Sequence, residues 1–400
     1  MSLKPVEDAM AAILARVPPV TAETVPLSEA AGRVLAAPVS ASHDQPPFDA
    51  SAMDGYALRA ADAANGAALR VIGMSQAGAG FEGTLGAGEA VRIFTGAPVP
   101  AGADTVIMQE EAVREGDLVR FTAPIRRGHS VRLRGNDFAV GNELLAPGTL
   151  LGPLQLTVAA AANAGTVSVA RRPSVALLAT GDELVPPGSP LGPDQIVASN
   201  SAGLLPLLSP YAERVIDHGI APDDRQELTS RLAAILADQP DLLVTTGGAS
   251  VGEHDLVQDV LKELGVTLDF WRINMRPGKP LMFGIRGKTL IFGLPGNPVS
   301  AMVTALVFIR PALRRWLGAT EPETWRLPLA APTPANTARR HFMRARLVRT
   351  EAGSQVLPIL ETDSGHTSSM VAADMLIVQP ENDPGRAAGA LVEAIPISGF

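Results

Sequence analysis

Residues 242–255 read LLVTTGGASVGEHD, and this stretch decides the fold class. Its first part, Leu242–Thr246, is an uninterrupted apolar and β-branched run, which is typical of a strand buried on both faces of a sheet. The glycines Gly247 and Gly248 follow, and apolar residues then recur at helical spacing from Val257 onward. The stretch therefore predicts a strand, a glycine-rich turn and a helix.

Two other stretches have the same organisation. Residues 174–183, SVALLATGDE, and residues 289–300, TLIFGLPGNPVS, each join a buried-strand run to a polar end that contains glycine. Within residues 289–300, Asn297 and Pro298 are residue types preferred at a helix N-cap and at the first helical position. Repeated strand–helix units predict an α/β domain, with a mostly parallel sheet and helices on both faces.

The chain changes character on both sides of this α/β region. Between about residues 38 and 141, short apolar runs alternate with glycine and proline turns, which predicts a small β domain. Val6–Val17 and Leu150–Ala164 carry helical patterns. Past about Ala319, short strands and turns return, so a second β domain is expected to close the chain.

Composition excludes several classes of protein. The 400 residues carry a net charge of −8, and their 33 basic residues form no long run, which argues against a nucleic-acid binder. The absence of cysteine excludes disulfides, thiolate metal sites and thiol catalysis. No apolar run is long enough for a membrane span, and Glu7 and Asp8 interrupt the apolar start that a signal peptide needs. We therefore expect a soluble, cytoplasmic protein without membrane or nucleic-acid partners.

The predicted strands all deliver glycine-rich loops to one sheet edge, and ligands of open α/β sheets bind beyond the carboxyl ends of the strands. Glycine lets the backbone approach a ligand, and the amides at a helix N-terminus attract anions. One such loop alone is as often a tight turn as a binding site. Three at one edge favour a site for phosphate or for an oxyanion such as molybdate.

Several carboxylate side chains are also expected at this edge of the sheet. Asp182 and Glu183 directly follow a buried strand, whereas Asp223 and Asp255 precede helices and could simply be N-caps. Hard oxygen ligands grouped in this way suit Mg²⁺, which bridges carboxylates and substrate phosphates. His254 has no second histidine at metal-ligand spacing, so a surface or capping role is expected for it.

Basic residues gather in residues 271–280, WRINMRPGKP. Arg272 and Arg276 could grip phosphate with two parallel hydrogen bonds, and Lys279 could act as a point charge. The alternative is a solvated charged turn, but the stiffness of the proline-rich PGKP sequence favours a binding role.

Further polar turns lie in the predicted first β domain. Residues 48–57 (FDASAMDGYA) include Asp54, residues 95–100 (TGAPVP) begin with Thr95, and residues 134–137 (RGND) end with Asp137. Judged alone, such segments are turns more often than sites.

Taken together, seven strings resemble the molybdopterin molybdenumtransferases, a family that includes bacterial molybdenum-insertion enzymes and the C-terminal domain of gephyrin. The strings are QPPFDASAMDGYA, RIFTGAPVPAGADTVIMQEE, RGNDF, LLATGDEL, TTGGASVGEHD, RPGKP and FGLPGNPVS. The resemblance covers the chain from about residue 5 to its end and is weakest after Ala319.

The resemblance implies four domains. These are a discontinuous α+β linker domain (1–41 and 142–171), an inserted β domain (42–141), a three-layer α/β molybdopterin-binding domain (172–318) and a C-terminal β-barrel (319–400). It also implies a homodimer, in which the inserted β domain of one subunit completes the cleft of the other.

The family reaction that the resemblance implies inserts molybdate into adenylylated molybdopterin and releases AMP with Mg²⁺ as cofactor. A molybdopterin adenylyltransferase is a further partner that it suggests. The implied catalytic residues are Glu183, Asp182, Asp255, Asp223, Lys279, Asp54, Asp137 and Thr95, of which Glu183, Asp223 and Asp255 hold the metal. The implied substrate-binding residues are Gly247, Gly248, Ser250, Arg272, Arg276, Pro295, Gly296, Asn297, Pro298 and Ser300, with Arg344 and Ser364 as counterparts in the last domain.

Some positions depart from the family pattern. Arg272 and Arg276 stand where lysine is common, and Ala50, Asn136 and Ala198 replace other common residues. These departures bear on metal ligation and substrate placement rather than on the reaction class. A non-catalytic molybdopterin-binding scaffold and a different phosphohydrolase remain the competing hypotheses.

Overall fold

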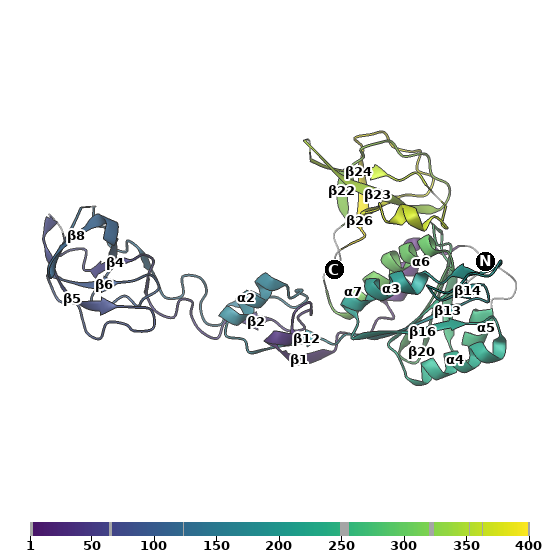
Figure 1. Cartoon of the computed structure of the whole chain (residues 1–400), viewed down its shortest axis with the longest axis horizontal. Coiled ribbons are helices and arrows are strands. Elements are labelled where there is room, and N and C mark those ends of the chain that lie inside the picture. The colour runs from purple at the N-terminus through teal and green to yellow at the C-terminus, as the bar shows by residue number, and fades with distance from the viewer. Residues whose placement is uncertain are drawn as a thin grey trace.

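The computed structural model describes residues 3–63, 66–122, 124–248, 256–319, 324–351, 353–361 and 363–398. The molecule is elongated: a β domain lies at one end, a small linker domain in the middle, and an α/β domain with a C-terminal β domain at the other end (Figure 1). This arrangement confirms the predicted multidomain α/β fold class.

The α/β domain is built on a six-stranded sheet with the order β16-β13-β17-β21-β20-β18. Four of its strands run parallel: β13 (Ser174–Thr180), β16 (Arg214–Ala221), β17 (Leu242–Thr246) and β21 (Thr289–Leu294). Two further strands extend the sheet in antiparallel pairings: β20 (Pro280–Arg286) and β18 (Thr267–Arg272). The mostly parallel sheet was predicted, and the antiparallel edge was not.

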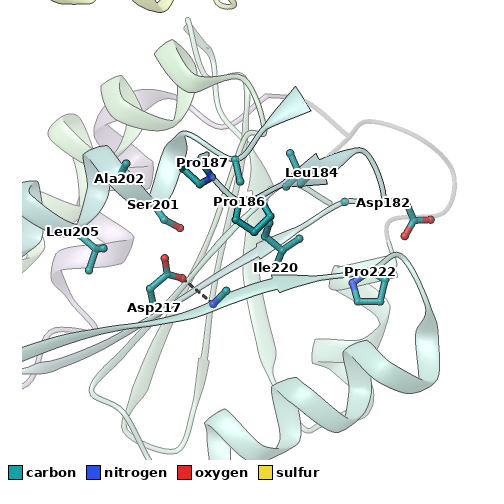
Figure 2. Close-up of a pocket in the computed structure, with 13 residues that line it drawn as sticks. Asp182, Leu184, Pro186, Pro187, Ser201, Ala202, Leu205, Asp217, Ile220 and Pro222 are labelled. Carbon is teal, nitrogen blue, oxygen red and sulfur yellow. Dashed lines mark hydrogen bonds between the residues drawn. The ribbon is translucent and has the colours of Figure 1, made fainter. Parts of the chain in front are cut away.

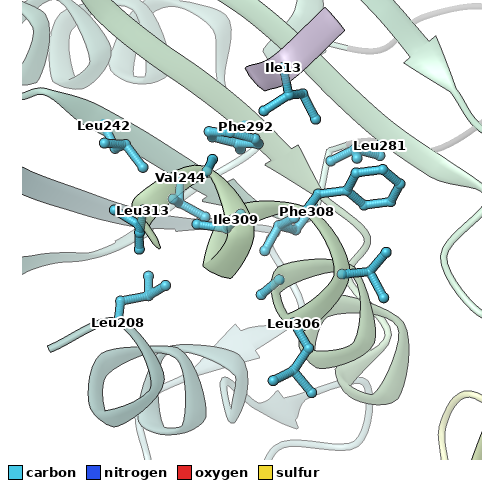
Figure 3. Packing of buried hydrophobic residues seen from close by; sticks show 14 of the residues in the cluster. Ile13, Leu208, Leu242, Val244, Leu281, Phe292, Leu306, Phe308, Ile309 and Leu313 are labelled. Carbon is cyan, nitrogen blue, oxygen red and sulfur yellow. The ribbon is translucent and has the colours of Figure 1, made fainter. Parts of the chain in front are cut away.

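Helices cover both faces of this sheet. Consecutive residues explain why: Leu177 packs into the core on one face and Leu178 into the core on the other, and each is 1% exposed. The first face carries α3 (Asn200–Leu208), α6 (Pro298–Thr304), a π-helical turn (Ala305–Ile309) and α7 (Arg310–Trp316) (Figure 3). The second face carries α4 (Arg225–Ala237) and α5 (Leu256–Glu263). A strand buried on both sides needs an uninterrupted apolar sequence, which is the pattern that the sequence shows.

Helix α1 (Val6–Leu14) also packs on the first face of the sheet. The expected boundaries place it with the linker domain, yet Val6, Ala9 and Ile13 join the core of the α/β domain. Their spacing forms one apolar stripe along the helix, and the sheet offers the larger surface against which to bury it.

The linker domain pairs segments from both sides of the inserted domain. Strand β1 (Ala22–Pro26) pairs with β12 (Thr166–Ala170), and β2 (Val39–Ser40) pairs with β11 (Glu143–Leu145), both antiparallel. The 3₁₀ turn η1 (Leu27–Glu29) and helix α2 (Pro153–Ala161) cover these strands. This pairing explains how residues far apart in the sequence share one small core.

The inserted β domain has a second six-stranded sheet, with the order β7-β4-β6-β5-β9-β8. Its strands are β4 (Gly55–Leu58), β5 (Leu69–Ser75), β6 (Glu89–Ile93), β7 (Thr105–Met108), β8 (Ala112–Glu115) and β9 (Leu118–Phe121), with η3 (Gln109–Glu111) between β7 and β8. A separate short pair, β3 (Ala50–Ser51) with β10 (Val131–Arg132), lies beside this sheet.

The C-terminal domain closes into a barrel. Its strands are β22 (Trp325–Pro328), β23 (Arg340–Thr350), β24 (Gly353–Pro358), β25 (Met375–Gln379) and β26 (Leu391–Pro396), and η6 (Thr367–Met370) precedes β25. Strands β24-β23-β25-β26-β22 are neighbours in that order. Leu329, just after β22, bridges Val356 of β24 and so joins the two ends.

The α/β domain also contributes a strand to this barrel. Strand β19 (Met275–Arg276), from the predicted basic segment, pairs in parallel with β23. This contact ties the basic segment to the C-terminal domain. None of the helices that the structure describes has the length and apolar character to cross a membrane.

Candidate active site

The candidate site lies along one edge of the α/β sheet, where the three central parallel strands end at the same level. Ala179 of β13 is paired with Thr246 of β17, which in turn is paired with Leu294 of β21. Strand β20 runs the opposite way and therefore begins at this edge, which brings Lys279, the residue before it, to the same side. Topology thus gathers the loops that carry Glu183, Gly247, Asn297 and Lys279. We call this edge the rim.

Glycine contacts show that the rim loops touch one another. A Cβ atom on Gly247 would lie 2.2 Å from the carbonyl oxygen of Thr180, and Gly247 has a φ of +87°. A Cβ atom on Gly296 would lie 3.7 Å from the Cα atom of Gly247. Gly247 therefore has neither the space nor the backbone conformation for a side chain.

A cavity of about 160 Å³ lies between these loops. Its walls come from β13, β17, the start of α3 and the start of α6. Among the predicted site residues, the cavity is lined by Glu183, Gly247, Gly296, Asn297 and Pro298. The other lining residues are Ala179, Thr180, Leu184, Ile196–Ser201 and Thr246.

A larger, more open pocket of about 630 Å³ adjoins it (Figure 2). The loop through β14 (Leu184–Val185) and β15 (Ile196–Val197) separates the two spaces, and Leu184, Ala198 and Ser201 line both. Prolines and aliphatic side chains dominate the larger pocket, with Asp182 and Asp217 as its charged groups. A ligand with both apolar and polar parts could span the two spaces.

Acidic residues at the rim influence one another. The backbone amide of Asp223 donates a hydrogen bond of 2.9 Å to the Asp182 carboxylate. Burial raises the pKa of the Asp223 carboxyl, and the negative charges of Asp182 and Glu183 raise this pKa further. A bound cation would relieve this repulsion.

The structure leaves the predicted metal site incomplete. Among the residues it describes, no three acidic, histidine or cysteine side chains are grouped so that they could hold a metal ion. Asp255, the third predicted metal ligand, and Ser250, a predicted substrate contact, lie outside the described residues, as does His254.

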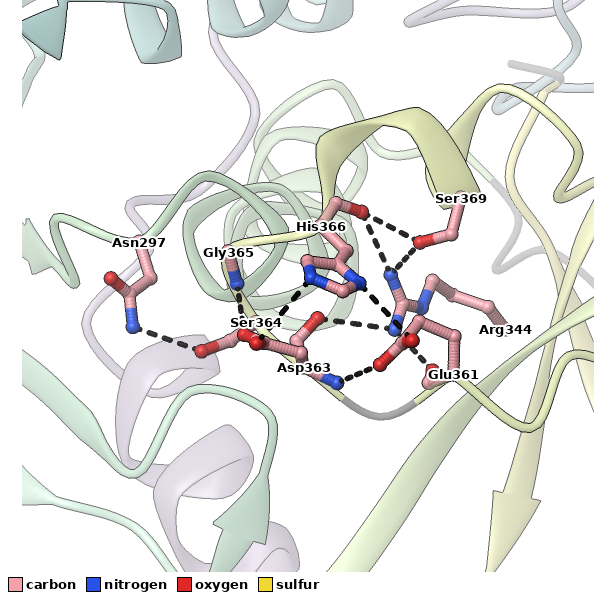
Figure 4. A network of polar contacts seen from close by, with 8 residues as sticks. All are labelled: Asn297, Arg344, Glu361, Asp363, Ser364, Gly365, His366 and Ser369. Atoms are coloured by element: carbon pink, nitrogen blue, oxygen red, sulfur yellow. Dashed lines mark hydrogen bonds and ion pairs between the residues drawn. The ribbon is translucent and has the colours of Figure 1, made fainter.

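The N-terminus of α6 is closed by the C-terminal domain. Asn297 occupies the predicted N-cap position, but its side chain makes no capping hydrogen bond. Instead its Nδ2 donates to the Ser364 hydroxyl at 2.9 Å (Figure 4). The amide of Val299 also donates to the Ser364 carbonyl, at 3.2 Å. Ser364 therefore occupies part of the space where an oxyanion was expected.

A buried arginine holds the loop that carries Ser364. Arg344 is 4% exposed and donates hydrogen bonds to the Ser369 hydroxyl and to the carbonyls of Glu361, Asp363 and His366 (Figure 4). Burial lowers the pKa of Arg344, and the neighbouring acids oppose this shift. The two residues that the resemblance suggested in this domain, Arg344 and Ser364, thus belong to one loop system at the rim.

The three basic residues of the 271–280 segment point to different surroundings. Gly278 packs so tightly on α6 that a Cβ atom there would lie 2.3 Å from the Thr304 hydroxyl, and this contact places Lys279 beside that helix. Arg276 reaches toward the barrel, where its Nε donates to Asn336 at 3.1 Å. Arg272 lines a separate pocket of about 430 Å³ together with Lys4.

Positive charge accumulates where Arg276 meets the barrel. His341 lies there, 5% exposed, near Arg276, Arg344 and Arg339. Burial, reinforced by these cations, lowers the pKa of His341 to about 4. An anion bound here would be attracted by the same charges.

The predicted residues of the β domain lie far from this rim. Asp54 accepts hydrogen bonds from the amide and the hydroxyl of Thr95 at 2.7 and 2.8 Å, and these bonds lower the pKa of Asp54. Asp137 lines a pocket of about 580 Å³ with Phe48 and Arg132. Because this domain is at the opposite end of the molecule (Figure 1), these side chains do not reach the rim of their own chain.

Sequence reasoning missed two residues of the site. Asn200 lines the smaller cavity, and Asp217 lines the larger pocket. Asn200 begins a helix directly after a rim segment, and this position was a usable signal. Asp217 sits in the middle of an edge strand at a register irregularity, for which the sequence contains no local sign.

Three family models match consecutive parts of the chain. Residues 4–163 match the MoeA N-terminal region (domain I and II), residues 176–315 a probable molybdopterin binding domain, and residues 326–397 the MoeA C-terminal region (domain IV).

Relatives and solved structures agree. The molybdopterin molybdenumtransferase of Haemophilus influenzae is 34% identical over 95% of this chain and 95% of its own. That of Staphylococcus aureus strain Mu50 is 31% identical over 98% of this chain and 95% of its own. The crystal structure of the molybdopterin biosynthesis MoeA protein of Pyrococcus horikoshii has a TM-score of 0.84 and 32% identity, and the match covers 100% of both chains. The chain therefore belongs to the molybdopterin molybdenumtransferases, enzymes of molybdenum cofactor biosynthesis.

Proposed function

We propose that this protein inserts molybdate into adenylylated molybdopterin, in a Mg²⁺-dependent reaction that releases AMP. The observation that carries the proposal is the contact of the Thr180, Gly247 and Gly296 loops at one rim, beside two adjoining cavities. Family membership supports the reaction class. The two adjoining cavities at the rim offer space for a ligand whose phosphates lie between two ring systems, as in an adenylylated pterin.

AMP release is a hydrolysis: water attacks at phosphorus, the phosphoanhydride bond breaks, and one phosphate stays on the pterin. This step mainly requires neutralisation of the charge on the separating phosphates. Lys279 stands at the rim as a cation, and the close-packed glycines Gly247 and Gly296 let the backbone of these loops approach a phosphate. In this proposal molybdenum is bound by the dithiolene sulfur atoms of the molybdopterin substrate, which agrees with the absence of cysteine from the chain.

The acidic residues suit Mg²⁺ in their chemistry, since carboxylate oxygens are its preferred protein ligands. Glu183, Asp223 and Asp255 would hold it, with Asp182 fixing the Asp223 loop through its hydrogen bond. The raised pKa of Asp223 supports this assignment, because crowded carboxylates favour a divalent cation. When bound, the ion would neutralise phosphate charge.

Molybdate would enter from the side where the α/β domain meets the barrel. Arg276 and the cations around His341 supply positive charge there, and Ser300 of α6 lies close to the Gly278 backbone. Arg276 presents a planar fork where a lysine would be a point charge, which suits a tetrahedral oxyanion.

A second copy of the chain completes the site in this proposal. Asp54, Thr95 and Asp137 lie too far from the rim of their own chain to act there, so they would serve the rim of a partner subunit in a homodimer. The exposed side chains of Phe48 and Met53 flank these residues and offer apolar contact area.

The substrate indicates the preceding reaction. An adenylylated pterin must be made by adenylyl transfer, so a molybdopterin adenylyltransferase would supply it, and we place both steps in the cytoplasm. The test is incubation of the purified protein with adenylylated molybdopterin, Mg²⁺ and molybdate. We expect release of AMP and formation of active cofactor. Binding of the pterin without either product would favour the alternative, a non-catalytic scaffold.

A further inference from the structure

Asn200 presents an unused hydrogen-bond acceptor at the rim. It is the first residue of α3, and its Nδ2 donates to the carbonyl of Gly296 at 2.8 Å. Its Oδ1 is buried and accepts no hydrogen bond within the described part of the chain. Buried polar atoms in folded proteins normally have a partner, so this oxygen needs an explanation.

The orientation of the Asn200 amide follows from its contact. If the amide were turned over, its oxygen would face the carbonyl oxygen of Gly296, and two acceptors would oppose each other. The amide group therefore stays as it is, with its nitrogen held by the Gly296 loop. Rotation of the amide group therefore cannot provide Oδ1 with a hydrogen-bond donor.

The space beside Asn200 is limited. Asn200 and Gly296 both line the cavity of about 160 Å³, together with Glu183 and Asn297. A protein cavity of about 150 Å³ accommodates one benzene ring. The cavity thus has room for one six- or five-membered ring. Because the Oδ1 atom of Asn200 lacks a hydrogen-bond partner within the described part of the chain, a ring that enters is favoured if it carries N–H or O–H donors.

We propose that Asn200 Oδ1 accepts a hydrogen bond from a donor-bearing ring of the substrate and so helps to select it. This inference rests on the proposed function and deepens it. The adenylylated pterin offers two rings with the required chemistry: the ribose, through its hydroxyls, and the amino-substituted pyrimidine ring of the pterin. The experiment distinguishes them.

The experiment measures binding by isothermal titration calorimetry to the full-length protein and its Asn200→Ala and Asn200→Asp variants. One set of probes is AMP and its 2′- and 3′-deoxy forms. The other set is pterin (2-amino-4-oxopteridine) and 4-oxopteridine, which lacks the 2-amino group. In each set, the first compound carries a donor that its analogue lacks. The ratio of the two dissociation constants cancels any general effect of a variant on the site.

We expect the wild type to prefer one donor-bearing probe by about tenfold, the usual effect of leaving a buried acceptor unpaired. Asn200→Ala should lose this preference. Asn200→Asp, which retains an acceptor oxygen but cannot donate to Gly296, should retain it. A preference for AMP assigns the ribose, and a preference for pterin assigns the pterin ring.

Other outcomes overturn the inference. An unchanged ratio of dissociation constants in Asn200→Ala would mean that Oδ1 accepts a hydrogen bond from neither ring. Loss of the ratio in both variants would leave Asn200 with only a structural role through Gly296. Failure of the folded wild type to bind either AMP or pterin would contradict the proposed function itself, and the inference with it, so the two failures are distinguishable.

Discussion

Asn297 and Ser364 are hydrogen-bonded across 2.9 Å although 67 residues separate them in the sequence. This bond, with the contact of the Ser364 carbonyl to the amide of Val299, joins the C-terminal domain to the start of α6. The two domains therefore share the construction of the rim, and the C-terminal loop covers one side of the proposed oxyanion pocket.

A double-mutant cycle measures this connection. Asn297→Ala and Ser364→Ala should each destabilise the protein by about 1 kcal/mol, the usual contribution of one hydrogen bond. In the double variant the two effects should not add, because either change already removes the bond. Urea unfolding gives the free energies. Strict additivity would show that the bond contributes nothing in solution.

Gly247→Ala should disrupt the rim. The new methyl group would meet the Thr180 carbonyl at 2.2 Å, in addition to the strain of a φ of +87°. Gly265→Ala is a matched control, because Gly265 has a φ of +84° and a Cβ atom added there would meet no atom within 4 Å. The control should lose about 1 kcal/mol of unfolding free energy from the backbone alone. Gly247→Ala should lose clearly more unfolding free energy. Equal losses in the two variants would show that the close contact with the Thr180 carbonyl does not affect stability.

His341 should make the protein sensitive to acid. Its pKa is lowered to about 4 in the folded state, below the 6.5 of an unperturbed histidine. The unfolded chain therefore binds a proton first, and stability falls as the pH drops from about 6.5 to about 4 and then levels off for this group. Over this pH range His341 lowers the free energy of unfolding by about 3 kcal/mol. His341→Gln should remove this part of the pH dependence in unfolding measurements between pH 7 and pH 4. An unchanged profile would place the acid sensitivity elsewhere.

Glu183→Gln should abolish Mg²⁺-dependent AMP release and leave the fold intact, because Glu183 lines the cavity and is exposed. Glu227→Gln serves as the control, since the Glu227 side chain pairs with Arg231 on the surface of α4. Its loss should change stability by less than about 1 kcal/mol and turnover hardly at all. Turnover by Glu183→Gln at the wild-type rate would exclude this carboxylate from the mechanism.

Local patterns predicted the parts of the fold that local physics decides. The run Leu242–Thr246 is a buried strand because both of its faces are covered, and Asn297 does begin a helix after its glycine turn. Asp224 caps α4 by accepting a hydrogen bond from the amide of Glu227 at 2.8 Å, a contact between residues three positions apart. These features depend on neighbours within a few residues.

Contacts between distant segments could not be predicted in this way. Nothing near Asn297 indicates that Ser364 is its partner, and nothing near Arg276 indicates that its strand joins a barrel built from residues beyond 324. The apolar stripe of α1 predicts a helix but not the surface that it covers. Asn200 became a candidate only when burial revealed that one of its two polar atoms lacks a partner in the described part of the chain.

The central claim is that the rim of one chain and the β domain of another form one catalytic site. The most direct measurement mixes Glu183→Gln and Asp54→Asn subunits and compares AMP release with that of each variant alone. A mixed dimer contains one site with both changes and one site with neither. We predict that each variant alone is inactive and that the mixed dimer recovers up to half of the wild-type rate. No recovery in a confirmed mixed dimer would contradict the shared site.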